Sequence, residues 1–113
     1  MIKVDVLLTP LTKQVYGIIL KGHAESAEYG KDLVCAAVSA IVTGGANAMM
    51  EFSEDICSIK LKSGNSKIIS KLVGNSIPTN DELILKIIVT QLETVAESYG
   101  EFIQINKIVK EKV

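Results

Sequence analysis

The sequence contains one histidine, His23, and two cysteines, Cys35 and Cys57. His23 ends a strand-like run, and Cys35 lies near the start of an uncharged, helix-like run that opens at Asp32. A thiol acts as a nucleophile in its thiolate form, and a nearby imidazole is its usual base or ion-pair partner. These residue types therefore predict a cysteine–histidine pair, provided that the fold brings the end of the strand to the start of the helix.

We interpret Asp32 as the N-cap of this helix, which makes Cys35 the third helical residue. Backbone N–H groups of the first turn lack intrahelical acceptors, and the helix dipole is positive there, so a thiolate is favoured. The same amides are donors for the oxyanion that forms when a thiolate attacks a peptide carbonyl. Asp32 has a second interpretation, as the group that orients the His23 imidazole, but capping is favoured over it.

Both residues of the pair also have a structural explanation. Cys35 lies among alanines and valines, where a cysteine is commonly a small buried hydrophobe. An imidazole such as that of His23 at a strand end often makes one backbone hydrogen bond and nothing more. Gly22 and Gly30 favour the catalytic interpretation, because glycine permits close backbone approach beside His23 and a hinge in the loop before the helix.

Ser39 follows Cys35 by one helical turn and is therefore expected on the same helix face. It is either a polar wall of the site or a hydroxyl bonded to the carbonyl four residues earlier. Cys57 alternates with apolar residues in a predicted strand, which indicates a core position. Two cysteines and one histidine cannot supply a four-ligand zinc site, so we expect no metal, and no organic cofactor is indicated.

The elements that position these residues are predicted in the order β-β-α-β-β-α-β. Alternation of apolar and polar residues is typical of strands, and it occurs at Ile2–Thr9 and Ile56–Lys62. Further strands are predicted at Val15–His23, Lys67–Gly74 and Glu101–Ile108. Gly64-Asn65 is expected to form the hairpin turn between the third and fourth strands. Hairpins mixed with helices favour an α+β fold, with two helices packed on a mainly antiparallel sheet.

The two helices are predicted from different signals. The first has no charge from Leu33 to Met50, but its small and polar residues make it too weakly hydrophobic to span a membrane, so burial from more than one side is expected. Its Gly44-Gly45 pair favours a self-association surface and hence a homodimer. The second helix begins at a predicted capping box between Thr79 and Glu82. Its expected buried face consists of Ile84, Ile87, Ile88, Leu92, Val95 and Tyr99.

Composition narrows the class of protein. The 113 residues are 48% hydrophobic and 22% charged, which predicts one globular domain over residues 1–113. Net charge is −1, all twelve basic residues are lysines, and no basic run occurs, so we expect protein or peptide partners and no direct nucleic-acid binding. The alternating N-terminus predicts a strand and no signal peptide, and the cysteine content fits a reducing, cytoplasmic setting.

The residues around the pair have a family resemblance. Gly22-His23-Ala24, then the run Gly30–Ala36 with Cys35 near its end, then Ser39, resembles the ribosomal-processing cysteine proteases of the Prp family. The resemblance extends over the whole chain in length and element order. It implies a homodimeric, cytoplasmic endopeptidase that removes a short N-terminal extension from large-subunit ribosomal protein 27, cutting after an aromatic residue.

The same resemblance implies roles for individual residues. Cys35 would be the nucleophile and His23 the general base. The loop of residues 24–31 would be a mobile cover over the substrate groove. This loop includes Glu25, Ser26, Tyr29 and Gly30.

Two other interpretations stay open on the residues alone. One is a non-enzymatic, ribosome-associated binding module in which Cys35 is a buried structural residue. The other is a redox-sensing thiol, for which Cys57 would be a partner close in space.

Overall fold

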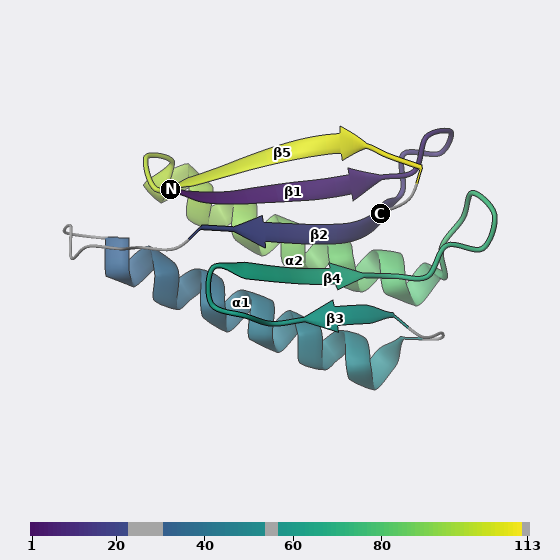
Figure 1. Ribbon diagram of the computed structural model, residues 1–113, viewed down its shortest axis with the longest axis horizontal. Helices are drawn as coiled ribbons and strands as arrows, with labels where there is room; N and C mark the ends of the chain where they lie inside the picture. Colours follow the sequence, from purple (N-terminus) through teal and green to yellow (C-terminus); the bar gives the residue numbers. More distant parts are fainter. Residues whose placement is uncertain (23–30, 54–56, 112–113) are drawn as a thin grey trace.

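The computed structural model describes residues 1–22, 31–53 and 57–111, including their side chains apart from those of Lys31 and Asp32. The elements follow the predicted order (Figure 1). They are β1 (Ile2–Leu8), β2 (Val15–Lys21), α1 (Lys31–Phe52), β3 (Ser58–Lys60), β4 (Asn65–Ile69), α2 (Thr79–Tyr99) and β5 (Ile103–Val109).

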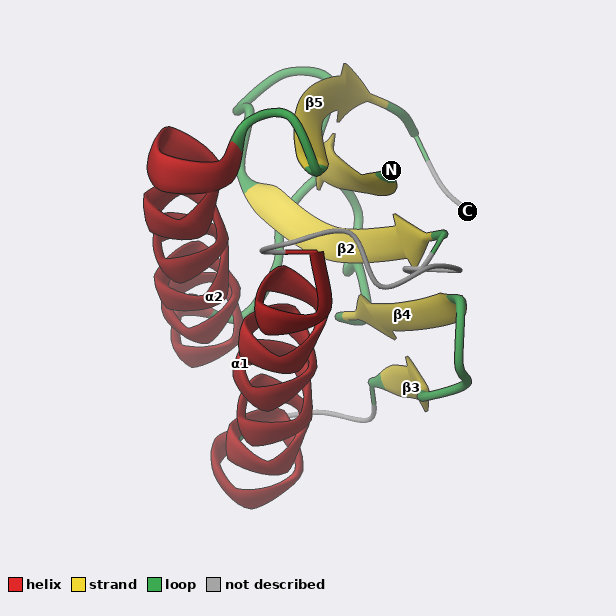
Figure 2. Cartoon of the chain, turned by 90° about the vertical axis from the view of Figure 1, so that its left-hand side faces the viewer, coloured by secondary structure: helices red, strands yellow, loops and turns green. Residues whose placement is uncertain are grey.

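The described strands form one mixed sheet in the order β3-β4-β2-β1-β5. Neighbouring strands are antiparallel except for β1 and β5, which are parallel. Both helices lie on the same face of this sheet, so the other face has no helix on it (Figure 2). The predicted α+β fold, with two helices on a mainly antiparallel sheet, is confirmed.

The core lies between the sheet and the helices. Alternate residues of the central strands point toward the helices and are fully buried, among them Val4, Val6, Ile18 and Ile68. Apolar side chains of both helices meet them, namely Val34, Val38, Val42 and Met49 from α1 and Leu85, Ile88, Val89 and Leu92 from α2. Burial of this apolar surface is the main stabilising contribution, at roughly 25 cal/mol per Å².

The helix pair is closely packed at one glycine. A Cβ placed on Gly45 would lie 2.5 Å from the Cδ1 atom of Ile88, so a larger residue there would require the Ile88 side chain or one of the helices to shift. Gly44, its neighbour, has nothing within 4 Å of such an added Cβ. The two glycines therefore have different roles. Gly45 permits the close contact between α1 and α2, whereas Gly44 lies on the open outer surface of α1.

The buried face of α2 differs from the predicted one. Ile88 and Leu92 are buried as expected, but Ile84 is only half-buried and Ile87 is 48% exposed. Leu85 and Val89 take their places against the core. The helix is apolar over more than one stripe, and the stripe that contacts the sheet was not distinguishable from the sequence.

The predicted capping box is wrong. Thr79 is the first residue of α2, Pro78 occupies the N-cap, and no side chain caps the helix. The Glu82 carboxylate instead accepts a hydrogen bond from the Val15 amide at the start of β2, at 3.1 Å. A tertiary contact has replaced the local one, since this amide at the strand end also requires an acceptor.

A buried carboxylate connects the start of α2 with the ends of α1 and β4. Asp81, in the first turn of α2, has no exposed surface. Its Oδ2 atom accepts hydrogen bonds from the hydroxyls of Ser70, just after β4, at 2.6 Å and of Ser53, just after α1, at 2.9 Å. Its position at a helix N-terminus and these charge-assisted bonds stabilise a buried negative charge.

α1 also has the length and apolar composition of a membrane-spanning helix over Leu33–Phe52, the one such segment among the described residues. In this fold it packs one stripe against the sheet, with Val38 and Val42 buried. A second side of α1 contacts α2 at Gly45, so the expected burial from more than one side is confirmed, although Leu33, Met50 and Phe52 are exposed.

Candidate active site

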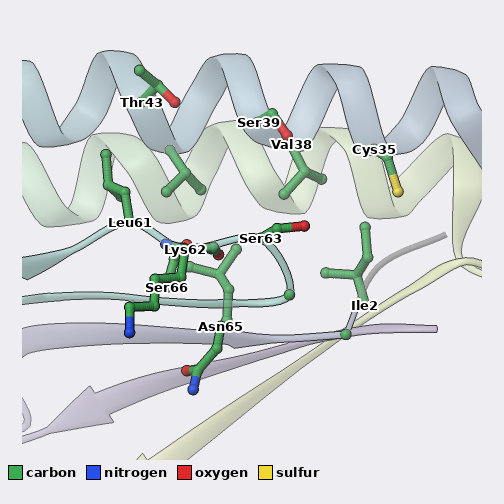
Figure 3. Close-up of a pocket in the computed structure, with 14 residues that line it drawn as sticks. Ile2, Cys35, Val38, Ser39, Thr43, Leu61, Lys62, Ser63, Asn65 and Ser66 are labelled. Carbon is green, nitrogen blue, oxygen red and sulfur yellow. Dashed lines mark hydrogen bonds between the residues drawn. The ribbon is translucent and has the colours of Figure 1, made fainter. Parts of the chain in front are cut away.

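A groove of about 480 Å³ lies between α1 and the turn of the β3–β4 hairpin. Cys35, Ser39 and Thr43, spaced by one helical turn each, lie along the α1 side with Val38 and Val42 (Figure 3). Residues 61–66 of the hairpin form the opposite wall, and Ile2 and Leu20 come from the ends of β1 and β2. The groove is large enough to hold several side chains of an extended peptide.

Cys35 lies at one end of this groove with its side chain partly exposed. Figure 3 shows the sulfur on the groove side of α1, toward the end where Ile2 lies. The thiol is reduced and reachable from the groove, as a nucleophile must be. The side chain is partly buried against the hydrophobic core, and the remainder of it borders the groove.

The helix begins two residues earlier than predicted. α1 starts at Lys31, so Asp32 lies inside the helix and is not its N-cap, and Cys35 is the fifth helical residue. A fifth residue donates its amide within the helix, whereas the unpaired amides belong to the first positions. The Cys35 amide is therefore not among the unpaired donors expected for an oxyanion, although its side chain is still close to the positive end of the helix dipole.

Gly22 fixes the end of β2 beside the groove. Its φ is +91°, a conformation that side-chain-bearing residues rarely adopt, and a Cβ on it would overlap the carbonyl oxygen of Met1. Its amide donates a hydrogen bond to the carbonyl of Gly64 in the hairpin turn, at 3.0 Å. The predicted close backbone approach at Gly22 is confirmed, and it joins β2, the N-terminus and the hairpin at the end of the groove.

The hairpin turn differs from the predicted one by one residue. The Asn65 amide bonds to the Lys62 carbonyl at 3.0 Å, so Ser63 and Gly64 are its central residues. Gly64 has φ +76°, which explains why glycine stands there. The turn therefore presents small polar residues to the groove, opposite Cys35 and Ser39.

Of the other predicted site residues, the structure describes Ser39 fully and Asp32 only in part. Ser39 is exposed in the groove, and its hydroxyl makes no hydrogen bond to any described residue, so the predicted alternative of a bond to the Cys35 carbonyl is not formed. Asp32 is described only as backbone of α1. His23 and the loop residues Glu25, Ser26, Tyr29 and Gly30 lie outside the described residues.

Cys57 has a different environment from Cys35. It lies at the other end of α1, beside Ser53 and the Asp81 carboxylate. Burial, and then the negative charge of Asp81, raise the pKa of the Cys57 thiol, although a hydrogen bond from Ser53 opposes them in part. A raised pKa keeps this sulfur protonated at neutral pH and hence weakly nucleophilic.

Sequence reasoning did not find the hairpin wall of the groove. Leu61, Ser63 and Asn65 line it but carry no pattern typical of a catalytic group. The available signal was the turn glycine Gly64, which marks a hairpin but does not say which helix face the hairpin approaches. That depends on the strand order, in which β4 pairs with β2.

Comparison with known proteins gives a consistent result. The family model for the cysteine protease Prp matches residues 1–104. The ribosomal processing cysteine protease Prp of Staphylococcus aureus is 34% identical over 108 residues, covering 94% of this chain and 98% of that relative.

Solved structures agree with this match. Prp from S. aureus in complex with a substrate peptide has a TM-score of 0.82 at 32% identity, and the match covers 96% of this chain and 100% of that one. The same enzyme with a covalently linked product peptide has a TM-score of 0.79 at 33% identity, with the same coverage. With a reduced thiol at the end of a peptide-sized groove and these matches along nearly its whole length, the chain belongs to the Prp family of cysteine proteases.

Proposed function

We propose that this protein is a ribosomal-processing endopeptidase that removes the N-terminal extension of large-subunit ribosomal protein 27 with a Cys35–His23 dyad. The observation that carries the proposal is the position of Cys35, whose thiol lies at the end of a groove beside Gly22, the residue that precedes His23. In this proposal the groove binds the peptide and His23, which follows Gly22 in the sequence, supplies the imidazole.

In this mechanism the Cys35 thiolate attacks the scissile carbonyl and forms a tetrahedral intermediate. His23 takes the thiol proton and later gives it to the leaving amine, after which water hydrolyses the thioester. The S. aureus relative with a covalently linked product peptide supports a step in which peptide and enzyme are joined. Cys35 is the fifth residue of α1, one turn from the unpaired amides at the start of the helix.

The oxyanion requires donors other than the Cys35 amide. Backbone amides at the very start of α1 are unpaired within the helix and lie one turn from Cys35. The Ser39 hydroxyl, which is exposed on the groove side one turn further along, is a second donor. We assign Ser39 a supporting role there, and Asp32 a role in the electrostatics of the helix start.

The groove favours an extended peptide with apolar side chains. Val38 and Val42 from α1 and Leu61 from the hairpin supply apolar contacts, while Ser63 and Ser66 supply polar ones. Such a lining fits a short segment with an aromatic residue near the cleavage point, with the loop of residues 24–30 as its cover. The S. aureus relative with a substrate peptide supports peptide binding in this fold.

We further propose that the protein works as a homodimer in the cytoplasm. A second, apolar groove of about 550 Å³ runs between the outer surfaces of α1 and α2, lined by residues such as Gly44, Phe52, Ile84 and Ile87. Exposed Leu83 and Ile87 continue this surface along α2. A second copy would cover apolar surface that is otherwise in contact with water.

The test is incubation of the protein with a peptide that contains the ribosomal extension and its cleavage point, followed by mass spectrometry. Wild type is expected to cut once, after the aromatic residue. Cys35→Ala is expected to bind the intact peptide without cutting it, because groove contacts remain while the nucleophile is lost. His23→Ala is expected to lose most turnover with a modest loss of binding.

Cys57→Ser is the matched control, since it removes the other thiol and is expected to cut almost normally. Cleavage by Cys35→Ala would refute the dyad. Binding without cleavage by wild type would instead support the non-enzymatic binding module.

A further inference from the structure

Four lysines gather on one face of the sheet. Lys3 in β1 is paired directly with Lys21 in β2, and Lys67 in β4 is paired directly with Lys60 in β3. Lys21 is also paired with Asn65, two residues before Lys67 along β4. Directly paired residues, and residues two apart on a strand, point to the same side of a sheet. These four side chains, here called the lysine band, therefore share one face.

This face is the one without a helix. The residues that precede Lys3, Lys21 and Lys67 point the opposite way, since side chains alternate along a strand. Those residues are Ile2, Leu20 and Ser66, all of which line the groove under α1. The lysine band thus lies on the far side of the sheet from the groove, on the surface that Figure 2 shows uncovered.

Within residues 1–22, 31–53 and 57–111, the strands of this face carry more positive than negative charge. Lys3, Lys21 and Lys60 are exposed and Lys67 is partly exposed. Among the described strand residues of the face, Asp5 is the one acidic residue, and it is partly buried. Like charges placed directly opposite each other destabilise a sheet, so the pairs Lys3–Lys21 and Lys60–Lys67 are unfavourable for folding alone. An anionic partner would offset this repulsion.

The geometry suits a phosphate backbone. Neighbouring strands are about 4.8 Å apart, so a band across four strands is about 14 Å wide. A nucleic-acid duplex carries one negative charge per about 1.7 Å of its axis, so several phosphates fit within this width. The described residues of this face include no arginine and no aromatic side chain, which are the usual groups for base readout and base stacking.

We propose that the lysine band is a docking surface for the phosphate backbone of double-helical RNA, bound without sequence preference. Its use, which is to hold the protease on an RNA–protein particle that carries its substrate, rests on the proposed function; the binding itself does not. Because the band and the groove lie on opposite sides of the sheet, a docked protein keeps its groove accessible. The proposal replaces the expectation of no nucleic-acid binding, which rested on the absence of a basic run in the sequence.

The test is fluorescence anisotropy of a labelled RNA hairpin titrated with the full chain at about 50 and about 200 mM KCl. The band variant carries Lys3→Gln, Lys21→Gln, Lys60→Gln and Lys67→Gln. The control variant carries Lys13→Gln, Lys86→Gln, Lys107→Gln and Lys110→Gln, which remove the same charge from other surfaces. Circular dichroism establishes that both variants are folded.

We expect wild type to bind more weakly at the higher salt concentration and the band variant to lose about tenfold or more in affinity at the lower one. The slope of log affinity against log salt concentration should become shallower by about 3.6, because about four phosphate contacts are lost. The control variant should stay within about threefold of wild type. Equal losses in the two variants, no binding by wild type at low salt, or equally tight binding of polyglutamate would each overturn the proposal.

Peptide cleavage separates this proposal from the proposed function. The band variant should cut the ribosomal extension peptide at the wild-type rate, since no band residue lines the groove. A protein that binds RNA through the band but cuts no peptide would contradict the proposed function and leave this inference standing.

Discussion

Gly22 packs against Met1 so closely that the carbonyl oxygen of Met1 occupies the space of a Cβ on Gly22. The same glycine has φ +91° and donates its amide to Gly64. It is therefore held by the N-terminus on one side and by the hairpin on the other, one residue before His23. This arrangement makes Gly22 a positioning residue for the imidazole in the proposed mechanism.

Gly22→Ala is expected to lower both stability and turnover. The left-handed conformation costs an alanine about 1–2 kcal/mol, and the overlap with Met1 adds to this by moving the end of β2. Urea unfolding should show the loss of stability, and kcat/KM for peptide cleavage should fall by more than the small unfolded fraction explains.

Gly74→Ala is the control for backbone strain. Gly74 has φ +65° but nothing within 4 Å of an added Cβ, and it does not line the groove. Its substitution should cost stability for the same conformational reason and leave kcat/KM unchanged. Equal effects of the two substitutions on kcat/KM would contradict a positioning role for Gly22.

The Ser70–Asp81 hydrogen bond is expected to be important for stability. Ser70→Ala removes a buried donor from a carboxylate that remains buried, which should cost about 1–3 kcal/mol of the free energy of unfolding. Thr94→Ala serves as its control, because the Thr94 hydroxyl bonds to the Thr90 carbonyl on an exposed helix face. That change should stay within about 0.5 kcal/mol of wild type. Matching losses would show that the buried site is no more sensitive than the surface.

The order of elements and the β1–β2 pairing were predictable from the sequence because they depend on local signals. Alternation marks the strands, and the short connection between Leu8 and Val15 favours an antiparallel pair. The spacing of Cys35 and Ser39 also placed them on one helix face, and both line the same groove. These features follow from the period of each element.

The features that were missed depend on tertiary contacts. Glu82 matched a capping box, but its carboxylate bonds to Val15, 67 residues away in sequence. Ile87 matched an apolar helix face, but the sheet contacts a neighbouring stripe of α2 instead. The hairpin wall of the groove and the lysine band require the strand order and register, which no short stretch of sequence contains.

The two thiols are expected to differ sharply in reactivity. Iodoacetamide at neutral pH should modify Cys35 much faster than Cys57, because Cys35 lies at an accessible groove and the pKa of Cys57 is raised by burial and by Asp81. The pKa of an unperturbed thiol is 9.0, and that of Cys57 is raised above it, so the rate of modification at Cys57 should keep rising as the pH passes 9.0. Peptide mapping by mass spectrometry separates the two sites.

His23→Ala should slow the modification of Cys35 and leave Cys57 unaffected, since the proposed ion pair involves only the first thiol. Similar rates at both cysteines in the native protein would remove the argument for an activated Cys35. The redox-sensing alternative with Cys57 as a nearby partner is wrong, because the two cysteines lie at opposite ends of α1, too far apart for a disulfide.

The outer helix surface is expected to form the dimer. Ile87 is 48% exposed and lines the apolar groove between α1 and α2, so Ile87→Glu would place a charge in the proposed interface. Wild type should sediment at micromolar concentration with about twice the chain mass of 12.2 kDa, and this variant should sediment as a monomer. The free-energy cost of burying an unpaired carboxylate between two copies is expected to exceed the stabilisation from the apolar contacts there.

Thr90→Glu makes the same change in charge at an exposed residue of α2 that does not line the apolar groove, and it should remain dimeric. Circular dichroism should show the same helix content for both variants, because neither side chain is in the core. If wild type sediments as a monomer, the apolar groove faces water and the homodimer is wrong. If both variants dissociate, net charge rather than this surface controls association.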